Sequence, residues 1–436
     1  MALDAPARAP REFDLVVYGA TGFTGRLAAR YLARAAPRGV KIALAGRNEG
    51  KLLDARGDAT RFDVVLASDE ASLAALARRA STVLSFAGPY DAADGIPLAL
   101  ARACASAGAD YLDITGEPQF VAAVIDACHD LARTNACALV SCCGYDSVPW
   151  DLGAAKAVEK ARASAGGATS VVATGHAGSS RGGVSGGTIA SAANIVAKKK
   201  TEVERGMGDP HYLAKRAGGW REKPDAAATK RWSSPQGTYR FDETTGFWTM
   251  PSIMAGINTK VVARSYALAP EAYGEKFTYD ESDLCASKTS AIAGTVGLGL
   301  FGLAFVTTPL RWLMRKTILP RQGEGPSEEL RENGYSHVYV VAKAEDAQGN
   351  PLEPWVAEFE FKNADPGYKG TAALACEAAL CLAIPSERAK LPWVKTGGGG
   401  CLTPSVALGD VLVERLQKAE NFSFTVKKLK DTVFLV

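Results

Sequence analysis

The chain has 436 residues, which is too long for a single ordinary hydrophobic core and predicts two packed domains. Hydrophobic residues make up 47% of the chain and charged residues 22%, values that exclude a disordered or fibrous protein. The 50 basic and 47 acidic residues leave a net charge of +3, which excludes a strong field that would recruit nucleic acid or an anionic membrane.

Residues 1–14 contain no apolar stretch of the length that a secretory signal requires, and they include acidic residues that transit peptides avoid. The 9 cysteines form no CxxC pair and no even disulfide framework, a pattern typical of a reducing compartment. We therefore expect a cytoplasmic protein. The 4 histidines show no HxxxH or similar spacing, so no metal site is predicted.

Residues 12–150 alternate short apolar runs with amphipathic stretches, as βαβ units do when their strands are buried on both faces. The expected strands cover residues 15–18, 41–45, 63–66, 82–86, 110–114 and 136–142. The expected helices between them cover residues 25–35, 71–79, 96–107 and 119–134. This order predicts an α/β fold with a doubly wound parallel sheet of the Rossmann type.

A glycine-rich segment follows the first expected strand and opens the first expected helix. It consists of Gly19, Ala20, Thr21, Gly22, Phe23, Thr24 and Gly25. Glycines in this place permit a tight turn and a close approach of the backbone to a pyrophosphate, whose charge the helix N-terminus attracts. The spacing is GxxGxxG rather than GxGxxG, which leaves that mechanism intact. The segment predicts a dinucleotide cofactor, and the alternative is a simple strand-to-helix turn.

The end of the second expected strand carries Arg47 and Asn48. NAD enzymes commonly place a carboxylate here, about twenty residues after the last glycine, on the ribose 2′-hydroxyl. The planar guanidinium of arginine suits a 2′-phosphate instead. We therefore expect NADP(H) in preference to NAD(H) as the cofactor. The alternative is a solvated arginine at a strand end.

Three polar loops follow the fourth, fifth and sixth expected strands, at the edge where open α/β sheets bind their ligands. We expect Gly88 and Pro89 to contact the cofactor. Carboxyl and phenol groups can be tuned by their surroundings to handle protons. The candidates for this role are Tyr90, Glu117, Tyr145 and Asp146. Turn formation alone would also explain the residue types in each loop.

After residue 150 the regular alternation ends, and residues 151–395 are expected to form an α+β domain for the substrate. Within it, residues 198–240 read as a surface excursion, and residues 335–344 and 355–362 predict a hairpin. A four-glycine run before a helical stretch at 402–416 predicts that residues 396–436 return to the first domain.

One small polar segment of the second domain is a substrate candidate. It consists of Ser185, Gly186, Gly187 and Thr188, and it precedes an apolar helical stretch. Its backbone N–H groups could face a carboxylate, phosphate or thioester oxygen. An ordinary capped helix start is the alternative.

Residues 289–310 form an uncharged run bounded by Lys288 and Arg311. The run is long enough to span a bilayer. However, glycines, threonines and Pro309 dilute it, and a span would divide the second domain between two compartments. We expect either a peripheral or shallowly inserted element at a lipid droplet or membrane surface, or a helix buried around an apolar substrate tunnel.

An ordered set of motifs along the chain resembles the saccharopine dehydrogenase-like oxidoreductases, including the mycobacterial trans-acting enoyl reductases. The motifs are GATGFTG, AGRN, FAGPY, YLDITGE, CGYDSVPWDLG, SGGTIAS, RSYAL, DPGYKGTA and GGGGCLTPSVALG. The resemblance covers most of the chain. It implies a Rossmann domain, a catalytic-type α+β domain and a C-terminal segment returning to the first domain. For the enoyl reductase branch it implies reduction of an acyl double bond in glycolipid or polyketide-lipid synthesis.

Two departures prevent the substrate from being carried over: Asp94 stands where similar proteins often have an aromatic residue, and the stretch 48–62 is short. We expect an NADP-dependent oxidoreductase acting on a lipidic or acyl small molecule. One alternative is a nucleotide-binding protein of lipid droplets or membranes without turnover. Another is a saccharopine dehydrogenase or reductase. The sequence leaves open the direction of hydride transfer and the oligomeric state, a homo-oligomer included.

Overall fold

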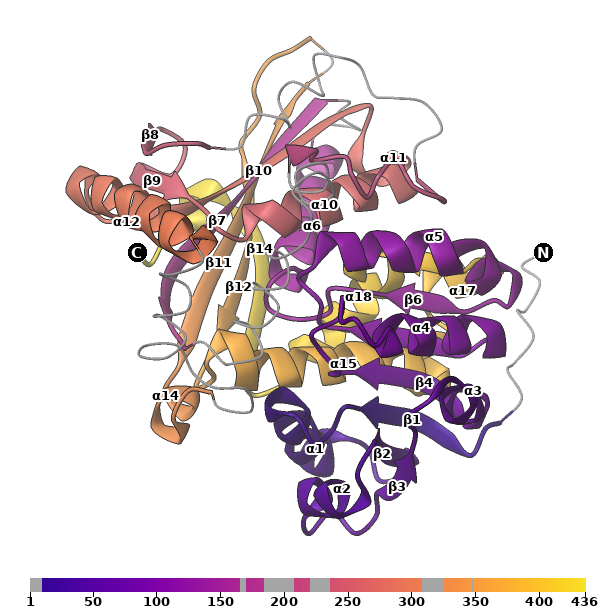
Figure 1. Cartoon of the computed structure of the whole chain (residues 1–436). Helices are drawn as coiled ribbons and strands as arrows, with labels where there is room; N and C mark the ends of the chain where they lie inside the picture. Colours follow the sequence, from indigo (N-terminus) through magenta and orange to yellow (C-terminus); the bar gives the residue numbers. More distant parts are fainter. Residues whose placement is uncertain (1–9, 165–169, 184–207, 220–235, 308–324, 347) are drawn as a thin grey trace.

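The structure of the protein is a computed structural model that describes residues 10–164, 170–183, 208–219, 236–307, 325–346 and 348–436. Two seven-stranded sheets stand beside each other, and helices pack against both (Figure 1). The first sheet belongs mainly to the N-terminal part of the chain. The second belongs to the middle and the C-terminal parts.

The first sheet has the strand order β13-β6-β5-β4-β1-β2-β3, and all its neighbouring strands are parallel. Its strands are β1 (Phe13–Tyr18), β2 (Ile42–Gly46), β3 (Asp63–Leu66), β4 (Ala80–Ser85), β5 (Asp110–Asp113), β6 (Ala138–Val140) and β13 (Gly400–Leu402). The apolar runs seen in the sequence are therefore strands, and all of them except the edge strand β3 are buried on both faces. The predicted doubly wound parallel sheet is confirmed.

Helices cover both faces of this sheet. They are α1 (Phe23–Ala35), α2 (Glu49–Arg56), α3 (Glu70–Arg79), α4 (Ile96–Ala107) and α5 (Pro118–Thr134). Helix α15 (Thr371–Ala383) comes from far along the chain, yet it packs between α1 and α18 (Pro404–Leu416) and contacts β1, β4 and β5. All residues of α15 are buried, because the first sheet lies on one side of it and helices flank it. Residues within 151–395 thus complete the core of the first domain.

The second sheet is mixed, with the order β14-β12-β11-β7-β10-β9-β8. Its strands are β7 (Ser170–Arg181), β8 (Arg240–Asp242), β9 (Phe247–Pro251), β10 (Lys276–Cys285), β11 (Tyr335–Glu345), β12 (Trp355–Phe361) and β14 (Phe422–Lys428). Strands β7 and β10 are parallel, and the other pairs are antiparallel. The antiparallel pair β11–β12 is the hairpin that the sequence predicts.

Helix α6 (Val148–Ser164) joins the two sheets, since it begins in the loop after β6 and packs on β11, β12 and β7. The approach is close: a Cβ on Gly153 would lie 2.7 Å from a methyl carbon of Val340. Helix α10 (Ala255–Leu268) packs beside α6 on the same face of the second sheet. This inner face is therefore the one that meets the first domain.

The C-terminal residues connect both sheets. Strand β13 adds to the edge of the first sheet beside β6, and β14 adds to the edge of the second sheet beside β12. The predicted return to the first domain is confirmed, and the structure adds a second crossing at β14. The remaining short elements are α11 (Pro270–Tyr273), α14 (Glu328–Glu332), η1 (Pro366–Gly370), α16 (Pro385–Arg388), α17 (Pro392–Lys395) and η2 (Leu429–Asp431).

The uncharged run at 289–310 forms most of helix α12 (Lys288–Val306). The last three residues of the run, 308–310, lie outside the described residues. In Figure 1 this helix projects from the body of the molecule beside β9. Several of its apolar side chains are exposed: Val296 to 54%, Leu300 to 62% and Leu303 to 65%. Within the described parts of the chain, no helix combines the length and the apolar character needed to cross a membrane.

Candidate functional site

The glycine-rich segment lies between the end of β1 and the first turn of α1. Gly19 has a φ of +79°, and a Cβ there would lie 2.8 Å from the backbone nitrogen of Ala87 in the loop after β4. A Cβ on Gly25 would lie 2.3 Å from the carbonyl oxygen of Gly19, so the helix packs directly on the turn. These two glycines are required by the backbone itself.

Gly22 is different, because a Cβ there would meet only the carbonyl oxygen of Gly19, at 3.4 Å. Gly22 is the N-cap residue of α1 and makes no side-chain cap, so no side chain of the N-cap residue covers the first free N–H groups of the helix. This is the arrangement that binds a pyrophosphate. The cradle therefore fits the dinucleotide that the sequence predicts.

The other residues of the segment have structural partners. Arg26 donates a hydrogen bond to the carbonyl oxygen of Thr21 at 3.0 Å, and Ala20 is fully buried. The ring of Phe23 packs edge-on against Tyr368 of η1 at 5.4 Å, and the guanidinium of Arg331 lies 5.4 Å from the same ring. Phe23 thus links the cofactor loop to residues from late in the chain.

Arg47 and Asn48 follow β2 at the same edge of the sheet, and both are exposed. The side-chain oxygen of Asn48 accepts a hydrogen bond from the backbone N–H of Lys51 at 2.9 Å and so caps α2. Arg47 is exposed at the edge of the sheet where Rossmann domains bind the ribose of a dinucleotide. An exposed arginine here is able to pair with a 2′-phosphate.

Tyr90 and Glu117 join the loops after β4 and β5. The carboxylate of Glu117 accepts hydrogen bonds from the backbone N–H groups of Tyr90 and Asp91, both at 3.1 Å. The hydroxyl of Tyr90 donates to the carbonyl oxygen of Ser85 at 2.8 Å, and its ring packs on Phe120. Both side chains are almost fully buried. Their hydrogen bonds fix the loop that contains Gly88 and Pro89.

The carboxylate of Asp113 joins the end of β5 to the loop after β6. It accepts hydrogen bonds from the hydroxyl of Ser141 at 2.9 Å and from the backbone N–H of Cys142 at 3.2 Å. Burial raises the pKa of Asp113 to about 6. These hydrogen bonds fix the start of the loop after β6, and Tyr145 and Asp146 follow in that loop at the interface of the two domains.

Asp146 is the half-buried carboxyl group at this edge. Its Oδ2 lies 3.6 Å from where a Cβ on Gly116 would stand, so the carboxylate covers the loop after β5. Burial raises the pKa of Asp146 to about 6. A carboxyl group that titrates near neutral pH can take up and release a proton during a reaction.

Tyr145 reaches from the first domain to the second. Its hydroxyl shares a 2.9 Å hydrogen bond with the hydroxyl of Ser336 on β11, and its ring packs edge-on against Trp150 and Phe361, each at 5.2 Å. Burial, with the nearby negative charges of Asp146, Asp283 and Glu281, raises the pKa of Tyr145. The phenol therefore stays protonated and is a hydrogen-bond donor.

Sequence reasoning missed the acidic residues that face Tyr145 from the second sheet. Glu281 on β10 accepts hydrogen bonds from the hydroxyl of Tyr279 at 2.8 Å and from the amide of Asn258 at 3.2 Å. Burial raises the pKa of Glu281 well above its ordinary value and that of Asp283 to about 6. The signal available in the sequence was the acidic YDESD run between Phe277 and Leu284.

Several known proteins are similar in sequence to this chain over nearly its whole length. A protein of Mycobacterium tuberculosis (strain H37Rv) with the provisional name trans-acting enoyl reductase Rv2449c is 38% identical to this chain, over 94% of the chain and 96% of that protein. Another protein of the same strain, named trans-acting enoyl reductase, is 35% identical over 94% of the chain and 97% of its own length. A Mycobacterium ulcerans protein of that name is 34% identical.

This chain belongs to the trans-acting enoyl reductase family. Residues 15–140 also match the family described as saccharopine dehydrogenase NADP binding domain. The predicted resemblance is thus confirmed, and so is NADP(H) as the cofactor. The chain is an NADP-dependent oxidoreductase. The apo saccharopine dehydrogenase of Saccharomyces cerevisiae aligns over 95% of this chain and 99% of its own, at 12% identity and a TM-score of 0.46.

In this member of the trans-acting enoyl reductase family, one predicted part of the site lies outside the described residues. It consists of Ser185, Gly186, Gly187 and Thr188. Most of the predicted excursion, residues 198–207 and 220–235, lies outside them as well. The described part of the site joins the cofactor cradle, the braced loops after β4 and β5, and the pair Tyr145 and Asp146.

Proposed function

We propose that this protein uses NADPH to reduce the carbon–carbon double bond of an α,β-unsaturated acyl substrate. The proposal is supported by the likeness to trans-acting enoyl reductases, which extends over 94% of the chain and includes both sheets. NADPH, when bound, supplies a hydride for the β-carbon of the substrate. The balance of the reaction then needs one proton at the α-carbon.

Asp146 is the proposed source of that proton. It stands at the carboxyl end of the first sheet, its pKa is raised to about 6 by burial, and the residue as a whole is half-buried. The hydroxyls of Tyr145 and Ser336 are the proposed donors to the acyl carbonyl oxygen, where negative charge develops during the reduction. Glu117 and Tyr90 are proposed to hold the loop that borders the nicotinamide.

A direct assay distinguishes this function from its alternatives. The purified protein is incubated with NADPH and crotonyl-coenzyme A, and NADPH loss and butyryl product are both measured. Reduction that places deuterium from labelled NADPH at the β-carbon is the expected result. NADP-coupled oxidation of saccharopine, without enoyl reduction, would support the saccharopine alternative. Tight NADPH binding without turnover of either substrate would support a non-catalytic nucleotide-binding protein.

We also propose that the substrate is lipidic and that the enzyme serves lipid or glycolipid synthesis. The enoyl reductase activity for which the relatives are named and the exposed apolar side chains of α12 both favour this. Lipid profiling of a strain that lacks the gene is the test. Accumulation of unsaturated precursors of a glycolipid is expected, and an unchanged lipid profile would contradict the assignment.

The exposed helix α12 supports a peripheral contact with a membrane or lipid droplet. Val296, Leu300 and Leu303 expose more than half of their surface, and Lys288 begins the helix with a positive charge. An apolar helix of this kind can lie in the interface of a lipid layer without crossing it. Binding to phosphatidylglycerol vesicles is expected to be lost in Leu300→Asp/Leu303→Asp. Equal sedimentation of both proteins with the vesicles would argue against it.

A further inference from the structure

A cavity of about 720 Å³ lies on the outer face of the second sheet, away from the cofactor cradle. Its floor contains Val172, Thr174 and His176 of β7, which alternate along the strand with residues of the inner face. Strands β10 and β11 add Thr278, Asp280, Val341 and Lys343 to the lining. A volume of this size falls in the range of about 300–1,000 Å³ that is usual for small-molecule sites.

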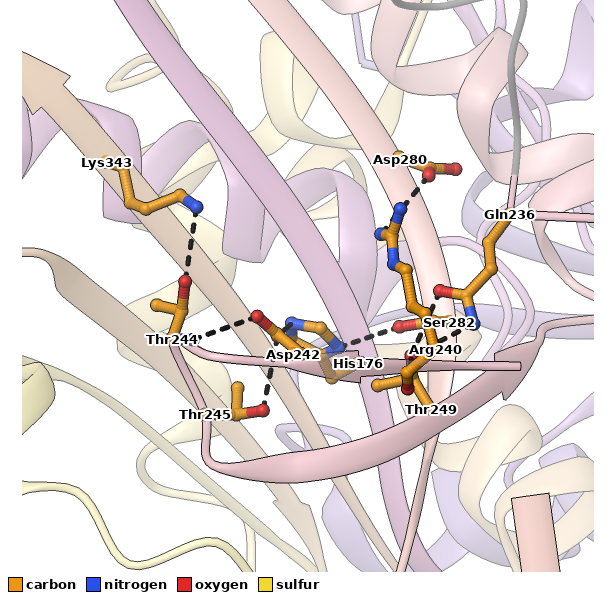
Figure 2. A network of polar contacts seen from close by, with 10 residues as sticks. All are labelled: His176, Gln236, Arg240, Asp242, Thr244, Thr245, Thr249, Asp280, Ser282 and Lys343. Carbon is orange, nitrogen blue, oxygen red and sulfur yellow. Dashed lines mark hydrogen bonds and ion pairs between the residues drawn. The ribbon is translucent and has the colours of Figure 1, made fainter. Parts of the chain in front are cut away.

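The cavity has a wall because the β8–β9 hairpin folds over the sheet. Strands β9, β10 and β7 separate β8 from β11 in the sheet order, yet the ammonium of Lys343 on β11 lies 3.2 Å from the hydroxyl of Thr244 in the turn after β8. Figure 2 shows this hairpin passing across the strands, with Lys343 and Arg240 extending from different elements. Both residues line the cavity. The sheet alone would present an open face.

Buried polar contacts hold the hairpin in this position. Asp242 of β8 lies 3.3 Å from Nε2 of His176, and its carboxylate also accepts the backbone N–H of Thr244 at 3.0 Å. The other ring nitrogen of His176 shares a 2.9 Å hydrogen bond with Ser282 on β10 (Figure 2). His176 is only 1% exposed. The imidazole therefore connects the sheet to the hairpin, with both ring nitrogens in polar contacts.

The hairpin is held at its other end as well. Gln236 donates a hydrogen bond to the hydroxyl of Thr249 at 2.9 Å, and that hydroxyl donates to the carbonyl oxygen of Arg240 at 3.2 Å. Both Gln236 and Thr249 are buried. The backbone at Arg240 is thus fixed, which places the guanidinium at the cavity.

Two cationic side chains, Lys343 and Arg240, line this cavity, and the charged group of each makes only a weak contact with its neighbour. Lys343 contacts the neutral hydroxyl of Thr244, and Arg240 lies 3.8 Å from Asp280, beyond hydrogen-bond length. Burial lowers the pKa of His176 to about 4, and the positive charges of Arg240 and Lys343 act in the same direction against the pull of Asp242. Both cations therefore lie near the same buried and neutral group, the imidazole of His176.

We propose that this cavity binds a small organic anion, with its carboxylate or phosphate between Lys343 and Arg240. The hydroxyls of Thr174 and Thr278 lie among the lining residues and suit a polar body attached to the anionic group. Two carboxylates also line the cavity: that of Asp242 contacts His176 and accepts a hydrogen bond within its own turn, and that of Asp280 lies 3.8 Å from the guanidinium of Arg240. Within the described residues, no three His, Cys, Asp or Glu side chains lie close enough to hold a metal ion.

Calorimetric titration of the NADPH-loaded protein tests the proposal with three probes of similar size: glycerol 3-phosphate, glycerate and neutral glycerol. Saturable binding of at least one anion, and not of glycerol, is expected. The stronger anion tells whether phosphate or carboxylate is the natural group. Lys343→Gln and Arg240→Gln are each expected to weaken binding about tenfold, as loss of a charge-assisted hydrogen bond does.

Lys362→Gln is the matched control, because Lys362 follows β12 and pairs with Glu360 at 3.0 Å, outside the cavity lining. This variant should bind the anion as the parent does, and NADPH affinity should be the same in all variants. Saturable binding of neither anion, or equal binding in Lys343→Gln, Arg240→Gln and the parent, would overturn the proposal. Enoyl reduction is measured separately, so these outcomes leave the proposed function untouched.

Discussion

The carboxylate of Glu117 accepts the backbone N–H of Tyr90 at 3.1 Å and so joins the loops that follow β5 and β4. We predict that Glu117→Gln weakens NADPH binding and lowers the free energy of unfolding by about 1–3 kcal/mol, because a buried N–H loses its acceptor. Fluorescence titration with NADPH and urea unfolding measure the two effects. A variant with normal NADPH affinity and stability but no turnover would instead make Glu117 a direct participant in the chemistry.

The cofactor preference is predicted to depend on Arg47. Arg47→Asp should lower NADPH affinity about 10- to 100-fold and leave NADH affinity nearly unchanged, because the hydrogen bonds of a guanidinium to a 2′-phosphate are lost and a like charge replaces them. Arg38→Asp is the control, since Arg38 is exposed in the turn before β2. An unchanged ratio of NADPH to NADH affinity in Arg47→Asp would contradict the role of Arg47.

The pH dependence of turnover is predicted to report on Asp146. Its proton is present below a pKa of about 6 and is lost above it, so kcat/KM should fall as the pH rises through that value. Asp146→Asn should remove this limb and lower kcat about 100- to 10,000-fold, with NADPH affinity retained. Asp130→Asn, at an exposed position of α5, is the control. A variant that keeps the parent pH profile would exclude Asp146 as the proton donor.

Two glycines of the same loop are predicted to respond differently to a methyl group. Gly25→Ala should lower the free energy of unfolding by about 1–3 kcal/mol, because its Cβ would meet backbone atoms that cannot move aside. Gly22→Ala should fold normally and weaken NADPH binding, since its Cβ would enter the space before α1. Gly39→Ala, where a Cβ meets nothing within 4 Å, is the control. Thermal unfolding with and without NADPH separates the two cases.

Local patterns were sufficient to predict the first sheet and its cofactor loop. The strands at 15–18 and 63–66 and the glycines from Gly19 to Gly25 are short, contiguous signals, and their outcome depends on backbone sterics and burial. The same holds for the hairpin β11–β12, whose alternation is visible in the sequence. The sequence offered four candidates for the proton donor: Tyr90, Glu117, Tyr145 and Asp146. The hydrogen bonds of Tyr90 and Glu117 in the structure then favoured a role in holding the loops for these two residues.

The sequence by itself determined the Rossmann domain, the NADP cofactor and the family, because these depend on residues that are adjacent or regularly spaced. Only the tertiary structure decided which polar groups meet across the chain. The hydroxyl of Tyr145 reaches Ser336, and the β8–β9 turn reaches Lys343 on β11, through packing of elements that are distant in sequence. Such pairs leave no periodic signal, since burial and charge at each site are set by neighbours that only the fold brings together.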